Sequence, residues 1–187
     1  MMNDTDTDYA KKYFDFLKDL DSDPEFCYSY ITRMTPDHPS YSKCIKVISK
    51  DAKWAYEYAS RNQKRWRHGE KTISQDPKYA YYYAKNIING RWKLGEKAIG
   101  TDAYSSLEYA KEVLGTRFEM GEQAIANAGD PVYAFEYAKQ VVRGRWELGE
   151  KSISRSKKLM VKYAKEILMG PLPEEMHNRM IAASIAA

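Results

Sequence analysis

Apolar residues recur along this chain at the spacing of one helix face, inside a block that itself repeats about every 26 residues. Gly-Glu pairs mark the blocks and begin at residues 69, 95, 121 and 149. A second string, Tyr-Ala, stands between them at residues 58, 83, 109, 137 and 163. No segment shows the sustained alternation of a strand. A fixed period of this length predicts stacked units of two helices each.

The apolar spacing places a longer and a shorter helix in each unit. We expect the longer helices at about 51–63, 76–89, 102–114, 130–143 and 156–169, and the shorter ones at about 65–74, 91–99, 117–127 and 145–154. Further helices are expected at about 6–20, from 23 onward, at 40–49 and at 174–185. An acid followed by proline, as in Asp23-Pro24, Asp76-Pro77 and Asp130-Pro131, is typical of a helix start.

The predicted fold is therefore all-α: a right-handed αα-solenoid of helix pairs about 26 residues long, with capping helices at both ends. Residues 1–187 are expected to form one helical-repeat domain. Within it, 1–50 is the N-terminal cap with a degenerate repeat, 51–170 holds the regular repeats, and 171–187 is the C-terminal capping helix.

Three residue types mark each repeat and are expected to be structural. They are an aromatic residue, a glycine three positions later and the glutamate after that: Trp66, Trp92, Phe118 and Trp146; Gly69, Gly95, Gly121 and Gly149; Glu70, Glu96, Glu122 and Glu150. Glycine inside a helix costs about 1 kcal/mol relative to alanine. We therefore expect a neighbouring backbone too close for a Cβ, and Gly→Ala at 95 or 121 to destabilise. A second set, Gly90, Gly115, Gly144 and Gly170, is expected to end helices in the left-handed conformation.

The repeated glutamate lies near the edge of the predicted core and needs polar partners. The repeated arginines Arg65, Arg91, Arg117 and Arg145 and the tyrosine hydroxyls of adjacent helices are the candidates. A row of catalytic carboxylates is the alternative, and the absence of an accompanying nucleophile, histidine or metal set disfavours it.

One candidate binding ladder combines basic side chains from successive repeats: Lys85, Lys111, Lys139 and Lys165 with Arg91, Arg117 and Arg145. A second repeated position is largely aromatic: Tyr28, Tyr56, Tyr81, Leu107, Phe135 and Val161. Basic residues interleaved with aromatic ones could follow a phosphate backbone and stack bases. Packing between helices and a solvated lysine face explain the same pattern, and Leu107 and Val161 weaken any stacking code.

Composition adds limits to this interpretation. The chain is 43% apolar and 30% charged, which is typical of a folded, soluble protein, and none of its apolar runs is long enough to span a membrane. Cys27 and Cys44 are expected to be reduced, buried thiols of a cytoplasmic protein. The net charge of +4 divides into −5 for residues 1–25 (three lysines, eight acids) and +9 for the rest. A basic body can attract nucleic acid or an acidic protein surface, or simply keep the protein soluble.

Runs of the type Tyr-Ala-Lys-x-Val/Ile-x-x-Gly-Arg-Trp/Phe-x-x-Gly-Glu-x-x-Ile, here over about 51–170, resemble tandem helical repeats of largely uncharacterised phage and bacterial proteins. The resemblance implies a helical array and no enzymatic activity. We expect a non-catalytic module, without metal or cofactor, that binds a protein partner in the cytoplasm. An accessory protein that inhibits or redirects a host factor, such as a defence component, would have this form. Nucleic-acid binding through the basic ladder is the alternative; no membrane partner is expected, and the sequence does not fix the oligomeric state.

Overall fold

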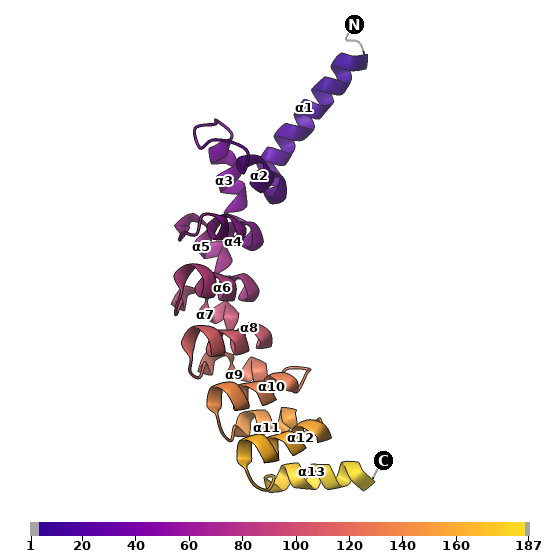
Figure 1. Cartoon of the computed structure of the whole chain (residues 1–187). Helices are drawn as coiled ribbons and strands as arrows, with labels where there is room; N and C mark the ends of the chain where they lie inside the picture. Colours follow the sequence, from indigo (N-terminus) through magenta and orange to yellow (C-terminus); the bar gives the residue numbers. More distant parts are fainter. Residues whose placement is uncertain (1–3, 186–187) are drawn as a thin grey trace. The chain divides into compact units, whose positions relative to one another are not determined.

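The computed structural model describes residues 4–185, and side chains from residue 11 to 182 except Phe14. The described residues form thirteen α-helices and four π-helical segments, and no strand occurs among them, so the fold is all-α (Figure 1). The chain divides into two compact units, Met1–Gln75 and Asp76–Ala187. Residues 1–3 and 186–187 of the predicted single domain lie outside the described part.

The N-terminal unit contains five helices: α1 (Asp4–Ser22), α2 (Pro24–Ile31), α3 (Tyr41–Ile48), α4 (Ala52–Arg61) and α5 (Arg67–Ile73). Its core gathers Leu20, Cys27, Ile31, Cys44 and Ile48, of which Ile31 is the most exposed, at 6%. Both cysteines are buried free thiols. Asp23 and Asp51 begin α2 and α4 by accepting hydrogen bonds from the backbone N–H groups of Phe26 (3.0 Å) and Trp54 (2.9 Å).

The C-terminal unit alternates longer and shorter helical segments. They are α6 (Pro77–Tyr83) with η1 (Ala84–Ile88), α7 (Lys93–Ile99), α8 (Ala103–Glu108) with η2 (Tyr109–Leu114), α9 (Glu119–Ala126), α10 (Val132–Glu136) with η3 (Tyr137–Val142), α11 (Glu147–Ile153), α12 (Lys157–Tyr163) with η4 (Ala164–Leu168), and α13 (Glu174–Ile185). The pairs α6–α7, α8–α9 and α10–α11 follow one another in Figure 1. Helix α7 contacts α9 and α9 contacts α11, while α6, α8, α10 and α12 make a second row.

The short helices of both units begin two residues later than the sequence predicted. The expected starts were residues 65, 91, 117 and 145, whereas α5, α7, α9 and α11 begin at Arg67, Lys93, Glu119 and Glu147. The aromatic residue before each start is the N-cap and has a non-helical backbone, with φ between −117° and −129° and ψ between 81° and 89°. The expected start of the short helices at the repeated arginine was therefore wrong, and Trp92 is the N-cap of α7 rather than a residue inside it.

The repeated glycines are crowded by side chains, and the expectation of a close backbone was wrong. A Cβ built on Gly95 would lie 2.7 Å from Cε3 of Trp92 and 3.0 Å from Cβ of Ala80. At Gly121 it would lie 2.7 Å from Cδ1 of Phe118, and Ser106 takes the place of the alanine. Gly69 and Gly149 meet Trp66 and Trp146 in the same way. The aromatic ring folds back over the glycine three residues later, so the two positions are coupled.

The π-helical segments end the long helices in a way the sequence did not predict. Gly115 is left-handed as expected (φ 64°), but at the other three ends the left-handed residue precedes the glycine: Asn89 (54°), Arg143 (57°) and Met169 (52°). The following glycine N–H then bonds back six residues, as from Gly90 to the carbonyl of Ala84 at 3.2 Å. A π turn holds more residues than an α turn, so a 3.6-residue pattern misplaces the helix end by one.

Substituting Met169 by glycine is expected to stabilise the C-terminal unit by about 0.5–1 kcal/mol, because a left-handed backbone costs a side-chain-bearing residue more than glycine. Met169 is 85% exposed, so little packing is lost. The measurement is the midpoint of thermal unfolding. Gly170→Ala is the matched control and should have a small effect, because its φ is not positive and its Cβ would meet only the carbonyl oxygen of Leu168 at 3.7 Å. A lower midpoint for Met169→Gly would contradict the assignment of strain.

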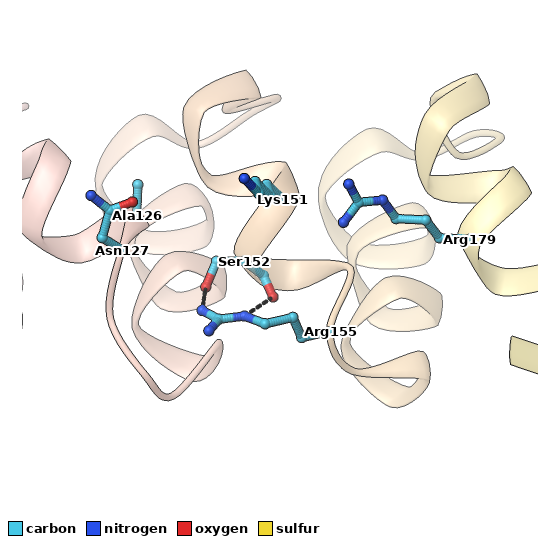
Figure 2. Close-up of a pocket in the computed structure, with 6 residues that line it drawn as sticks. All are labelled: Ala126, Asn127, Lys151, Ser152, Arg155 and Arg179. Carbon is cyan, nitrogen blue, oxygen red and sulfur yellow. Dashed lines mark hydrogen bonds between the residues drawn. The ribbon is translucent and has the colours of Figure 1, made fainter.

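The loop after α11 is tied to the preceding helix pair. Arg155 donates through Nη2 to the carbonyl of Ala128. It also donates through Nη2 to Oγ of Ser152 and through Nε to the carbonyl of Ser152 at 3.4 Å (Figure 2). Because Ser152 is almost fully buried, its two hydrogen bonds fix the Nε and Nη2 edge of the Arg155 guanidinium group.

Candidate interaction surfaces

An arginine and a glutamate five residues apart form a two-pronged ion pair in every repeat. We call this pair the clamp. Its Nε–Oε1 and Nη2–Oε2 distances are 2.9 and 3.1 Å for Arg65–Glu70, 2.6 and 3.1 Å for Arg91–Glu96, 2.7 and 2.8 Å for Arg117–Glu122, and 2.8 and 3.3 Å for Arg145–Glu150. In each clamp the glutamate is the enclosed partner and the arginine is about half exposed. The arginine predicted as a partner of the glutamate is confirmed.

Tyrosines of the long helices complete the clamps of the C-terminal unit. The hydroxyl of Tyr109 accepts a hydrogen bond from the N–H of Trp92 (2.9 Å) and donates to Oε1 of Glu96 (3.1 Å). Tyr137 does the same for the Phe118 N–H (2.9 Å) and Glu122 (2.8 Å). The hydroxyl of Tyr163 accepts from the N–H of Trp146 (2.8 Å) and donates to Oε1 of Glu150 (3.4 Å). Each tyrosine therefore joins the start of one short helix to the next long helix and supplies the acceptor for the N–H of the N-cap residue.

The protonation of these groups suits a structural role. Burial raises the pKa of Tyr109 to about 12, so it stays a hydrogen-bond donor. Burial alone would raise the pKa of Glu122, but hydrogen bonds from Arg117 and Tyr137 outweigh it and the pKa is lowered. The glutamate is thus ionised with its partners in place. The carboxylates hold helices together, and their geometry offers no support for the catalytic alternative.

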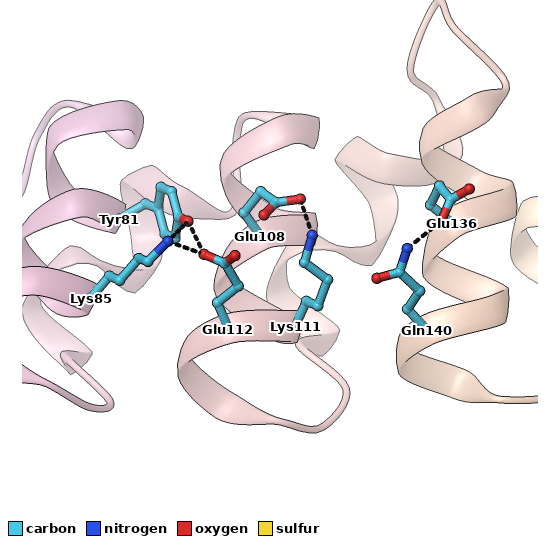
Figure 3. A network of polar contacts seen from close by, with 7 residues as sticks. All are labelled: Tyr81, Lys85, Glu108, Lys111, Glu112, Glu136 and Gln140. Carbon is cyan, nitrogen blue, oxygen red and sulfur yellow. Dashed lines mark hydrogen bonds and ion pairs between the residues drawn. The ribbon is translucent and has the colours of Figure 1, made fainter.

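The lysines of the candidate ladder are mostly ion-paired. Lys85 pairs with Glu112 of the next long helix, which also accepts from the hydroxyl of Tyr81 (Figure 3). Lys139 pairs with Glu166 at 2.8 Å in the same manner. Lys165 makes no hydrogen bond or ion pair with any residue that the structure describes.

Lys111 is also ion-paired, but not with the next long helix, because the repeat position that supplies the partner there holds a different residue. The position that supplies Glu112 and Glu166 holds Gln140 in the repeat between them. Gln140 donates to Glu136, and Lys111 instead pairs with Glu108 on its own helix at 2.6 Å (Figure 3). Three of the four ladder lysines are therefore compensated by carboxylates, which weakens attraction for a phosphate backbone.

The aromatic column is packing rather than a stacking platform. Tyr81, Leu107 and Phe135 are 2%, 6% and 3% exposed, because the next long helix covers them. The last member, Val161, is 56% exposed. It lines an apolar hollow of about 750 Å³ together with Met169, Leu172 and Met180, and Lys165 stands at that hollow.

Sequence reasoning missed an exposed apolar column on the short helices. Leu94, Met120 and Leu148 occupy one repeat position and are 56%, 56% and 45% exposed. We call these three residues the apolar stripe. Since α7 contacts α9 and α9 contacts α11, their side chains succeed one another along one row of helices. The signal was present in the sequence, because an apolar residue directly precedes the crowded glycine in three of the four blocks; the fourth has His68.

The arginines of the clamps lie beside this stripe. A hollow of about 340 Å³ is lined by Arg91, Arg117 and Met120 among others, and a second, of about 320 Å³, by Arg117, Arg145 and Leu148. The three ladder arginines thus share a face with the apolar stripe. The ladder lysines line neither of these hollows.

No helix within residues 4–185 is long and apolar enough to span a membrane. In the same part of the chain, no group of three histidine, cysteine, aspartate or glutamate side chains could hold a metal ion. A scan against protein-family models matches none, and comparison with characterised proteins and with solved structures finds no significant match.

Proposed function

We propose that the helix pairs form a right-handed αα-solenoid whose repeats are interchangeable steps along the stack. The recurrence of one set of contacts supports this. The bridge from a tyrosine hydroxyl to an N-cap N–H and a clamp glutamate recurs at Tyr109, Tyr137 and Tyr163. The ring contacts Tyr83–Trp92, Tyr109–Phe118 and Tyr137–Trp146 recur with centroid distances of 4.8, 5.1 and 4.7 Å. A repeat stabilised mainly by its neighbours fits a solenoid.

We further propose that this solenoid is a non-catalytic module that binds a protein partner through the apolar stripe. One observation carries the proposal: three large apolar side chains stay about half exposed in the same column of adjacent helices. Single exposed apolar residues are ordinary, but an aligned row flanked by arginines resembles the centre and rim of a protein interface. The resemblance to phage and bacterial repeat proteins makes a host protein the partner to test first.

Nucleic-acid binding is the less favoured function. Three ladder lysines are paired with carboxylates, and three members of the aromatic column are buried where bases cannot stack on them. The clamp arginines are committed to glutamates through two nitrogens each.

Changing the apolar stripe to serine, as Leu94→Ser, Met120→Ser and Leu148→Ser together, is expected to abolish partner binding while leaving the fold intact. Each side chain is about half exposed, so the cost to folding is small, whereas desolvation of the interface core supplies most of the binding energy. The measurement is quantitative affinity capture from lysate with the wild-type protein and the variant, after matching thermal melts.

The matched control is Val132→Ser with Val161→Ser, two apolar residues of similar exposure, 43% and 56%, on the long helices. Proteins that bind the wild type and the control, but not the triple serine variant, would support the proposal. If all three proteins capture the same set, or if the wild type captures nothing above background, the stripe is not a docking site.

A further inference from the structure

Three cationic side chains from separate segments surround one hollow in the C-terminal unit. Lys151 lies on α11, Arg155 in the loop after it and Arg179 on α13 (Figure 2). Ala126, Asn127 and Ser152 complete the lining of this hollow, whose volume is about 240 Å³. No carboxylate belongs to the lining. We call Lys151, Arg155 and Arg179 the basic pocket.

The three cations keep donors available. Arg155 is anchored through Nε and Nη2, and its Nη1 makes no hydrogen bond with the described residues. Arg179 donates to Oγ of Ser154 at 3.0 Å and pairs with Glu175, whose side chain is 80% exposed. Within the described part of the chain, the ammonium group of Lys151 has neither an ion pair nor a hydrogen-bond acceptor. Among the described residues, the exposed Arg179–Glu175 pair is thus the only ion pair that offsets the positive charge of these three side chains.

The surrounding sequence concentrates positive charge at this repeat. Residues 151–165 contain six basic residues and no acid. The corresponding segments of the two preceding repeats, 97–111 and 123–139, have net charges of 0 (two basic, two acidic) and −1 (one basic, two acidic). At the positions equivalent to Lys151 and Arg155, an earlier repeat carries Lys97 and Thr101, so the lysine recurs and the arginine does not. The repeat fold therefore does not require the arginine, and the earlier repeat serves as an internal comparison.

We propose that the basic pocket binds a phosphate group. Three cations around one hollow, of which only Arg179 has a carboxylate partner, repel each other, and an anion between them relieves that repulsion. A phosphate monoester carries a charge of about −1.5 to −2 at neutral pH, which balances the positive charge of the pocket better than one carboxylate does. A guanidinium offers a planar fork to two phosphate oxygens, while Lys151 acts as a point charge and Asn127 and Ser152 add polar groups. This site is independent of the apolar stripe.

The test is a titration of the full-length, ¹⁵N-labelled protein with inorganic phosphate at pH 7, at constant ionic strength set with sodium chloride. We expect saturable shifts of the backbone amides of residues 151–155 and of the Nε–H signals of Arg155 and Arg179. Lys151→Gln and Arg179→Gln should each weaken binding by roughly fivefold or more, because each removes a charge-assisted contact. The matched control is Lys97→Gln, which should bind phosphate like the wild type.

Lys151 and Arg179 are exposed, so the variants should fold, and a thermal melt checks this. Shifts that do not saturate, or that chloride alone reproduces, would overturn the site. Equal loss in Lys97→Gln and Lys151→Gln would do the same, since it would indicate general charge. Binding of a single-stranded oligonucleotide without binding of inorganic phosphate would replace the proposal by a nucleic-acid surface.

Discussion

Replacing Gly95 by alanine is expected to destabilise the protein by about 2–3 kcal/mol, although helix propensity alone predicts a gain of about 1 kcal/mol. The new methyl group would stand 2.7 and 2.9 Å from two ring carbons of Trp92 and 3.0 Å from Cβ of Ala80. Trp92 is 5% exposed and Ala80 is fully buried, so neither can move without opening the contact between α6 and α7. The measurement is the thermal midpoint, which should fall by roughly 4–12 °C in a chain of this length.

Gly90→Ala is the matched control, five residues away in the same repeat. A Cβ on Gly90 meets no atom within 4 Å and its φ is not positive, so its effect should stay within about 0.5 kcal/mol. If Gly95→Ala is as stable as Gly90→Ala, the Trp92 ring does not exclude a side chain at position 95, and the account of the crowded glycine is wrong. The same comparison is available at Gly149 and Gly144.

Replacing Arg117 by methionine is expected to cost about 2–3 kcal/mol at neutral pH, because the variant leaves Glu122 ionised, 7% exposed and without its guanidinium partner. The loss should depend on pH. In the wild type the pKa of Glu122 is lowered, so its contribution to stability is present above the unfolded pKa and lost as the pH falls through the folded one. Without Arg117, burial raises the folded pKa, and the cost grows as the pH rises through that value.

The difference in thermal midpoint between the wild type and Arg117→Met should therefore shrink from pH 7 toward pH 4.5. Adding Glu122→Gln to Arg117→Met removes the unpaired charge and should recover part of the loss at pH 7. A difference that does not change with pH, or a double variant no more stable than the single one, would indicate that the clamp contributes only packing.

The sequence predicted the repeat and the clamp because both depend on residue identity at a fixed spacing. The Arg–Glu–Tyr network follows from a buried carboxylate that needs donors, which the repeated arginines and tyrosines can supply. The aromatic column, left open between packing and stacking, is packing at Tyr81, Leu107 and Phe135. Gly→Ala was expected to destabilise because of a neighbouring backbone, whereas the crowding comes from the Trp92 ring. Helical periodicity does not reveal that this ring folds back on Gly95.

The features that could not be predicted depend on backbone geometry or on differences between repeats. The π turns shift the left-handed residue to Arg143 or Met169, which a 3.6-residue pattern cannot register. The apolar stripe is a different case, because a helical wheel already places Leu94 on the side away from Ile99, so its exposure could have been predicted. The basic pocket requires Arg179 on α13, outside the repeat, to lie beside Lys151.

Removing one whole period tests most directly whether the repeats are interchangeable steps of a stack. Deletion of residues 90–115 joins Asn89 to Thr116, brings Tyr83 before Phe118 and Ala80 before Gly121, and keeps the clamp of Arg117, Glu122 and Tyr137. We expect a protein that unfolds cooperatively, with unchanged helical ellipticity per residue and a lower thermal midpoint. An unfolded or molten product that binds a hydrophobic dye would contradict the solenoid, because a single interlocked core cannot lose a central segment of this length.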